Sequence, residues 1–209
     1  MMVRSTLALL ATSMVVLTAC SSQDDSCEGT ERRVCLVPLG RVSDDLVEHL
    51  VDHYLDEYGL EVRVLDNKSI PTDLVDPDRR QIGGIALIEY MGTLFPEAYA
   101  DPEAVLVGLT PVDLYLETRD WRFAFGTWGT AENPKGVVSS FRMDPENYGE
   151  PPDGELLLTR VRKMVTRYVG LLYYRMPTTS DPRSLLYDNI LSLRDLDGME
   201  ELLPVPASR

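Results

Sequence analysis

The sequence predicts a single α/β domain built on a mixed sheet, and three observations carry this expectation. Residues 34–91 alternate between short apolar runs and amphipathic helical segments, which is typical of strands joined through helices. Residues 104–143 hold closely spaced strand candidates separated by turn residues, which favours antiparallel pairing. Residues 155–174 carry apolar side chains at helical spacing over the longest stretch of the chain. We therefore expect a mixed sheet with mostly antiparallel ends and one long helix.

The opening elements follow from local signals. Residues 34–39 are apolar and end at a glycine, which indicates a buried strand. Ser43 is a good helix N-cap, acidic residues fill the first turn, and the helical pattern continues until Gly59. Residues 61–65 alternate between polar and apolar and predict a second strand. Residues 79–91 predict another helix, although two consecutive glycines weaken it.

The second half is expected to contain several short strands before the long helix. The strand candidates are residues 104–109, 113–116, 122–125 and 136–143. The long helix carries Leu157, Val161, Met164, Val165, Tyr168 and Leu172 on one stripe. Pro177 and Pro182 end it, because proline cannot continue a helix. Residues 184–203 are expected to close the fold with short helical pieces.

The N-terminus resembles a bacterial lipoprotein signal. Arg4 precedes an apolar run over residues 7–17, which is too short to span a membrane, and small residues lead to Cys20. We expect cleavage after residue 19, lipid on Cys20 and a flexible tether over residues 20–32, with the folded domain covering residues 33–209. An ordinary secretory signal with an incidental Cys20 is the alternative.

The net charge of the chain restricts the classes of molecule that it is expected to bind. The chain has 20 basic and 34 acidic side chains and a formal charge of -14. So acidic a surface disfavours nucleic acid and anionic lipid as general partners. The membrane is therefore expected to be reached through the lipid. The place expected is the bacterial cell envelope, on the outer face of the inner membrane or in the outer membrane.

Two further cysteines lie eight residues apart, Cys27 and Cys35. Exported thiols meet an oxidising compartment, so we expect a disulfide between them, with two free thiols as the alternative. Such a bond would hold the tether against the first strand.

Six blocks of the chain, in order, resemble the archaemetzincins, zinc-dependent aminopeptidase-like members of the metzincin clan. The blocks are RVCLVPLG at 33–40, DRRQ at 78–81, VGLTPVDLY at 107–115, FAFG at 123–126, VSSFR at 138–142 and RVRK at 160–163. The resemblance implies a zincin-like domain whose long helix once carried the active site.

The same resemblance implies a zinc motif that this chain lacks. In the family, His-Glu-x-x-His-x-x-Gly-x-x-His-Cys follows the last block, with three imidazoles on zinc and the glutamate activating its water. The equivalent positions here, in motif order, are Arg167, Tyr168, Leu171, Tyr174, Pro177 and Thr178. A family cysteine that resembles a second zinc ligand would fall at Arg183. No zinc, no metal ligands and no catalytic residues are therefore expected.

The sequence offers few candidate residues for catalysis or metal binding outside the zinc motif. His49 and His53 are the only histidines, and they lie four apart on the first helix among acidic residues. They are interpreted as a solvated polar face, with adventitious metal binding as the alternative. A serine or cysteine nucleophile would need one of these same histidines. The 34 acidic residues show no spacing that singles out a catalytic pair, and Asp113 is interpreted as a hydrogen-bonding residue at a strand end.

The long helix is basic in an otherwise acidic chain. Arg160, Lys163, Arg167 and Tyr174 recur at helical spacing on one side. One interpretation is that these cations pair with the carboxylates of the protein itself. The other is an anion-binding site in the vestigial cleft, with Arg167 as principal donor for a group such as a peptide C-terminus.

The sequence thus predicts a membrane-anchored lipoprotein that is a non-catalytic pseudo-peptidase and binds a peptide or protein ligand. The alternative is an active metallopeptidase or another hydrolase with a non-standard site.

Overall fold

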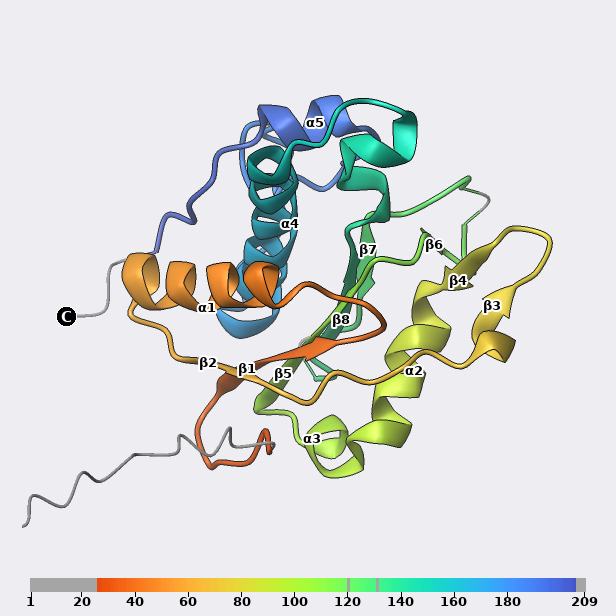
Figure 1. Cartoon of the computed structure of the whole chain (residues 1–209). Helices are drawn as coiled ribbons and strands as arrows, with labels where there is room; N and C mark the ends of the chain where they lie inside the picture. The colour runs from red at the N-terminus through yellow and green to blue at the C-terminus, as the bar shows by residue number, and fades with distance from the viewer. Residues whose placement is uncertain (1–25, 120, 131, 206–209) are drawn as a thin grey trace, which may run out of the picture.

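A five-stranded sheet forms the centre of the computed structural model, which describes residues 26–119, 121–130 and 132–205. The strand order is β2-β1-β5-β8-β7 (Figure 1). The first four strands are parallel, and β7 is an antiparallel edge strand beside β8. The strands are β1 (Arg33–Pro38), β2 (Val62–Val64), β5 (Ala104–Thr110), β7 (Gly126–Trp128) and β8 (Lys135–Ser139).

A smaller three-stranded sheet lies beyond the main sheet, in the order β3-β4-β6. Its members are β3 (Val75–Asp76), β4 (Gln81–Gly83) and β6 (Leu114–Tyr115). β3 pairs antiparallel with β4, and β4 pairs parallel with β6. Figure 1 shows these strands at the side of the molecule that also carries α2.

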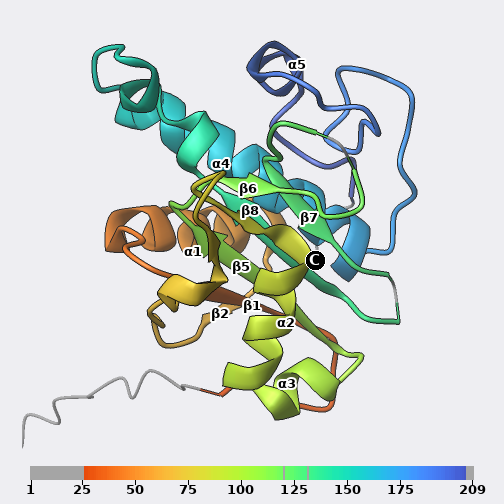
Figure 2. The ribbon, with the colours of Figure 1, turned by 90° about the vertical axis from the view of Figure 1, so that its right-hand side faces the viewer.

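Helices cover both faces of the main sheet (Figures 1 and 2). α1 (Asp44–Tyr58) and α4 (Gly154–Tyr168) share one core with Val34 and Leu36 of β1. α2 (Gly84–Leu94) and α3 (Pro96–Ala100) lie on the other face, where Cys35 and Val37 point. This alternation of neighbours along β1 is the two-residue period of a strand buried on both faces.

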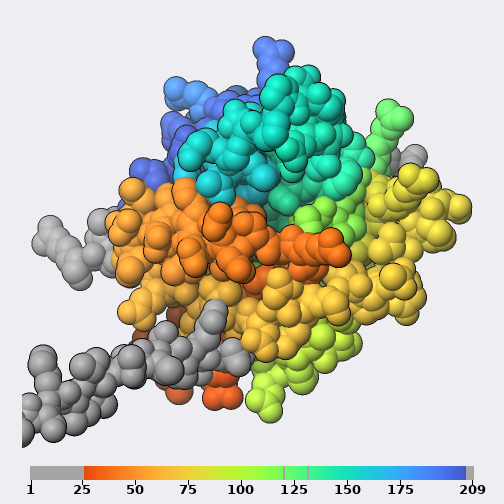
Figure 3. All heavy atoms as spheres, in the orientation of Figure 1, coloured from red at the N-terminus to blue at the C-terminus, as the bar shows by residue number. Residues whose placement is uncertain are grey.

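Short helical pieces complete the chain. The 3₁₀ turns are Thr72–Leu74, Phe141–Met143 and Pro145–Tyr148; a π-helical turn covers Val169–Tyr173, and α5 is Leu193–Gly198. The π turn continues α4 directly, so the expected helix over residues 155–174 is confirmed as α4 plus this turn. No helix in the described part of the chain combines the length and apolar character needed to cross a membrane. Figure 3 shows the same arrangement with all atoms drawn, with α1 and the segments around α4 side by side on the viewed face.

The expected disulfide is confirmed. Cys27 and Cys35 are bonded, with their Cα atoms 6.1 Å apart, and both are buried. Arg33 adds a hydrogen bond from Nε to the Cys27 carbonyl oxygen at 2.7 Å. The C-terminal part of the expected tether is thus held against β1, whereas residues 20–25, and with them Cys20, lie outside the described residues.

Three expectations about elements were wrong in detail. The helix expected from residue 79 begins at Gly84, because Arg80 adopts a left-handed turn (φ 56°) and residues 81–83 join the small sheet as β4. Residues 122–125 form only an isolated bridge from Ala124 to Leu114, and the strand there starts at Gly126. β5 and β8 pair parallel, because the excursion through β6 and β7 returns the chain to the same end of the sheet.

Candidate functional site

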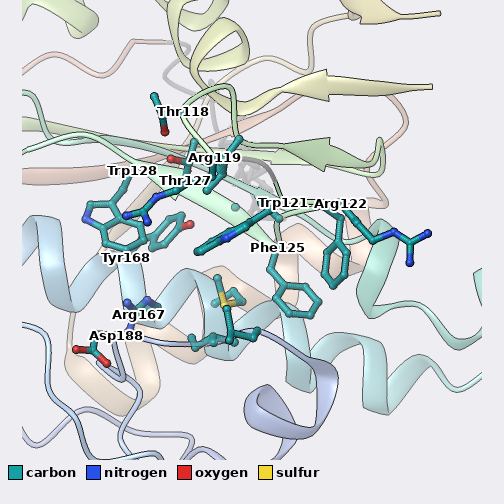
Figure 4. Close-up of a pocket in the computed structure, with 17 residues that line it drawn as sticks. Thr118, Arg119, Trp121, Arg122, Phe125, Thr127, Trp128, Arg167, Tyr168 and Asp188 are labelled. Carbon is teal, nitrogen blue, oxygen red and sulfur yellow. The ribbon is translucent and has the colours of Figure 1, made fainter. Parts of the chain in front are cut away.

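A cavity of about 630 Å³ opens between α4, the edge strand β7 and the segment that leads into β7 (Figure 4). Its walls come from parts of the chain that are far apart in sequence. The lining residues are Leu116, Thr118, Arg119, Trp121, Arg122, Phe123, Ala124, Phe125, Gly126, Thr127, Trp128, Met164, Arg167, Tyr168, Asp188, Ile190 and Leu191. Five aromatic residues and three arginines are among them.

Arg167 lies at the inner wall of this cavity, near the end of α4. Only 2% of the residue is exposed, and its Nη1 donates to the carbonyl oxygen of Leu185 at 3.1 Å. The guanidinium carbon lies 5.1 Å from the ring centroid of Trp128, which is a cation–π contact. Burial lowers the pKa of Arg167, and the negative charge of Asp188 opposes that effect in part.

Tyr168 follows Arg167 and is fully buried. Its ring packs on Gly136 of β8, where a Cβ atom would come within 2.9 Å, so a glycine is needed there. The Tyr168 ring also meets Trp128, with centroids 5.5 Å apart. Its hydroxyl oxygen has no hydrogen-bond partner among the described residues, and burial raises its pKa. This oxygen lies against β7, where a Cβ atom on Gly126 would come within 2.5 Å of it, and Figure 4 shows the Tyr168 ring beside Trp128 in the cavity wall.

The other cations of α4 face away from the cavity. Arg160 forms a two-pronged ion pair with Asp197 at 2.7 and 2.8 Å and donates to the carbonyl oxygen of Met143. Lys163 donates to the carbonyl oxygens of Leu196 and Asp197. Both side chains therefore fix α5 onto α4.

The structure does not bring the four predicted anion-binding residues into one site. Arg167 lines the cavity, whereas Arg160 and Lys163 are occupied at α5. Tyr174 is partly buried and packs edge-on against Tyr173, with centroids 4.9 Å apart. Arg160 thus pairs with a carboxylate of the protein, Lys163 donates to backbone carbonyls, and Arg167 is a buried residue in the cavity wall.

His49 and His53 lie apart from this cavity, on α1. Nε2 of His49 accepts from Nη1 of Arg162 at 2.8 Å, because an arginine can only donate. His53 is partly buried, and burial together with the nearby charge of Arg162 lowers its pKa to about 4. Nε2 of His53 has no partner among the described residues. A solvated polar face is therefore an incomplete description of this pair.

Sequence reasoning missed most of the cavity wall. Trp121 and Trp128 are partly exposed aromatic residues beside the edge strand, and their exposure could not be inferred from a local pattern. Asp188 comes from a loop near the end of the chain. Asp113, predicted as a strand-end hydrogen-bonding residue, accepts from Arg142 and from Gln81.

The α/β fold that frames this cavity is similar to the fold of solved structures of a zinc-dependent peptidase and an archaemetzincin. A zinc-dependent peptidase from Methanocorpusculum labreanum superposes with a TM-score of 0.65, at 22% identity, over 81% of this chain and 94% of that one. The archaemetzincin structure from Methanopyrus kandleri gives a TM-score of 0.62, at 26% identity, over 82% and 88%.

Comparison of sequences identifies the family. An archaemetzincin of Thermococcus kodakarensis is 31% identical over 147 residues, which cover 68% of this chain and 76% of the relative. No family model matches the chain. The chain belongs to the archaemetzincin family.

The zinc of such peptidases does not fit the residues present here. In the ungapped match that starts from RVRK at 160–163, the family's first two zinc-binding histidines fall on Arg167 and Leu171, a permanent cation and a hydrocarbon, neither of which donates a lone pair to a metal. Pro177 stands at the third position and is exposed. Within residues 26–119, 121–130 and 132–205, no group of three or more His, Cys, Asp or Glu side chains is arranged to hold a metal ion. No step through zinc is therefore derived for this chain.

Proposed function

We propose that this archaemetzincin is a membrane-anchored pseudo-peptidase that binds a ligand in the cavity between α4 and β7. One observation carries the proposal. The positions where the resemblance places the zinc ligands hold residues that cannot coordinate zinc, and a cavity of about 630 Å³ that Arg167 lines lies beside α4. A cavity of this volume lies within the range of small-molecule and peptide-side-chain sites.

The aromatic lining supports a binding role. Trp121, Trp128 and Phe125 offer large apolar faces, and Arg167 and Tyr168 bring polar groups between them. Binding pockets commonly combine a mostly apolar wall with a few placed polar groups. An anion is the ligand group that Arg167 would take, and a peptide or protein would supply the apolar part.

Zinc binding is the first test. We expect the purified full chain to contain no stoichiometric zinc, to hydrolyse no peptide when zinc is added, and to melt at an unchanged temperature. A ligand at a hundred times its dissociation constant stabilises a protein by about 2.7 kcal/mol, which would be visible as a shift of several degrees. Melting scans with micromolar zinc, with and without chelator, provide the measurement. A zinc-dependent rise that the chelator reverses would favour the peptidase alternative.

Membrane anchoring is the second test, and it depends on Cys20. We expect Cys20→Ala to block acylation, so that the protein is recovered uncut or in the soluble fraction, because lipid chains on that cysteine supply the membrane affinity. Fractionation and intact-mass measurement report both effects. Ser21→Ala is the matched control and should stay with the membrane. Unchanged mass and retention for Cys20→Ala would remove the lipoprotein assignment.

A further inference from the structure

Arg167 is a buried cation without a counter-ion in the described protein. It takes part in no ion pair there, and its hydrogen bonding is limited to the contact from Nη1 to the Leu185 carbonyl oxygen. Nε and Nη2 make no hydrogen bond within the described residues. A guanidinium stays charged, and a charge removed from water is costly unless it is paired. An anion that entered the cavity would supply the missing partner.

Tyr168 offers a second unused donor beside the first. Its hydroxyl is buried and unpartnered among the described residues, and it lies against β7, where a Cβ atom on Gly126 would come within 2.5 Å of it. A buried hydroxyl without a partner loses its hydrogen bonds to water and gains none in return. Two consecutive residues of α4 that line the cavity therefore carry donor groups that make no hydrogen bond within the described residues.

The adjoining walls are apolar and aromatic. Trp128 contacts both the Arg167 guanidinium and the Tyr168 ring, and Trp121 faces them across the cavity (Figure 4). Met164 and Ile190 add aliphatic surface. A flat or bulky apolar group placed here would bury both its own surface and that of the partly exposed tryptophans.

The charged residues that line the cavity favour an anion. They are Arg119, Arg122, Arg167 and Asp188, which leave the lining with a net positive charge, and Asp188 lies close enough to influence Arg167. Arg122 extends away from Arg167 at the other end of the view in Figure 4. A carboxylate also matches the planar fork of a guanidinium better than a tetrahedral group does.

From these contacts we propose that the cavity binds a free carboxylate attached to an aromatic or large apolar group, with Arg167 and Tyr168 as the two donors. A peptide C-terminus with an aromatic last residue has this chemistry. The inference rests on the proposed binding function and names the ligand class of that site. The proposed activity is recognition and not hydrolysis, because the ligand is bound through the free carboxylate at the C-terminal end of a peptide chain.

Matched small ligands test the proposal without altering the protein. The probes are N-acetyl-phenylalanine, its carboxamide and N-acetyl-alanine, titrated calorimetrically into the full chain in a neutral detergent. We expect the acid to bind about tenfold to a hundredfold more tightly than the amide, because a charge-assisted hydrogen bond replaces a neutral one. N-acetyl-alanine should bind more weakly than N-acetyl-phenylalanine, because it leaves the tryptophans uncovered.

Variants then assign the donors. Arg167→Met should bring the ratio of acid to amide affinity close to one, and Tyr168→Phe should lower acid affinity several-fold. Tyr168→Phe removes no hydrogen bond within the described protein, so it tests the site even if Arg167→Met folds poorly. Arg194→Ala also deletes one positive charge, from α5, and should leave the ratio unchanged.

The outcomes separate this inference from the proposed function. Equal affinity for acid and amide, or an acid preference that survives in Arg167→Met, overturns the carboxylate assignment even if zinc is absent and the binding role stands. A purely structural role for Arg167 predicts lower stability of Arg167→Met with the acid preference retained. Stoichiometric zinc, by contrast, would overturn the pseudo-peptidase function itself.

Discussion

At the scale of single residues, two buried tyrosines provide a matched comparison. Tyr54 is fully buried, and its hydroxyl shares a 3.0 Å hydrogen bond with Oγ1 of Thr166, whereas the hydroxyl of Tyr168 has no partner among the described residues. Tyr54→Phe should lower the free energy of unfolding by about 1–2 kcal/mol, because it strands a buried threonine hydroxyl. Tyr168→Phe should leave it unchanged or raise it by about 1 kcal/mol.

Denaturant melts of the two variants measure the difference. A large loss for Tyr168→Phe would mean that its hydroxyl is satisfied in solution, and the polar half of the proposed ligand site would then need revision.

His53 gives the chain a pH dependence at the same scale. Its pKa falls from 6.5 to about 4 in the folded state, mainly because of burial. The unfolded state therefore binds more protons between these values, so stability is complete above pH 6.5 and is lost as the pH falls toward 4. The ionisable groups that act on it are Arg162, His49, Glu201 and Asp56. The loss should reach about 2–3 kcal/mol after allowance for partial solvent screening.

Unfolding measured from pH 7 to pH 4 tests this expectation when His53→Gln is followed in parallel. In the variant, the free energy of unfolding should fall less steeply between pH 6.5 and pH 4, because the contribution of His53 is removed while other groups titrate equally in both proteins. Parallel curves for the two proteins would show that His53 does not carry the dependence.

At the scale of elements, local patterns predicted which segments form buried helices and strands, but not which elements contact one another. The stripe on α4 and the alternation of β2 identified their elements, because burial of one face imposes a period on the sequence. The partners of Arg160 and Lys163 lie on α5, more than thirty residues further along, and no periodicity encodes such a meeting. The same limit hid the cavity, whose wall combines β7, α4 and Asp188.

Recognition of the family supplied what periodicity could not. The order of six blocks identified the fold, whereas the helix expected from residue 79 was placed too early, because Arg80 adopts a left-handed conformation and residues 81–83 form β4. The disulfide was predictable because only Cys27 and Cys35 remained once Cys20 was assigned to lipid, and because thiols in an exported protein are expected to oxidise. The partners of Arg160, Lys163 and Arg167 on α4 depend on tertiary packing, which the local sequence does not encode.

At the scale of the whole molecule, acidic residues outnumber basic ones, and several of the basic residues form ion pairs. The formal charge is -14, while arginines such as Arg33 and Arg142 are engaged with Asp101 and Asp113. These pairs leave an acidic exterior around a cavity with cationic walls. An anionic ligand would thus be repelled at a distance and held at Arg167, so its affinity should rise with moderate salt until screening reaches the site itself.

The acidic exterior also predicts how salt affects folding. Like charges repel one another more in the compact state than in the expanded one, so sodium chloride should raise the melting temperature between about 20 and 200 mM, where the screening length shortens to near 7–8 Å. Sodium chloride is preferred to sulfate, which stabilises proteins by exclusion from their surface regardless of charge. Neutralising exposed acidic residues that form no ion pair within the described residues, as in Asp56→Asn together with Glu57→Gln on α1, should reduce the effect. A melting temperature that falls with salt would mean that pairs such as Arg160 with Asp197 outweigh the net repulsion.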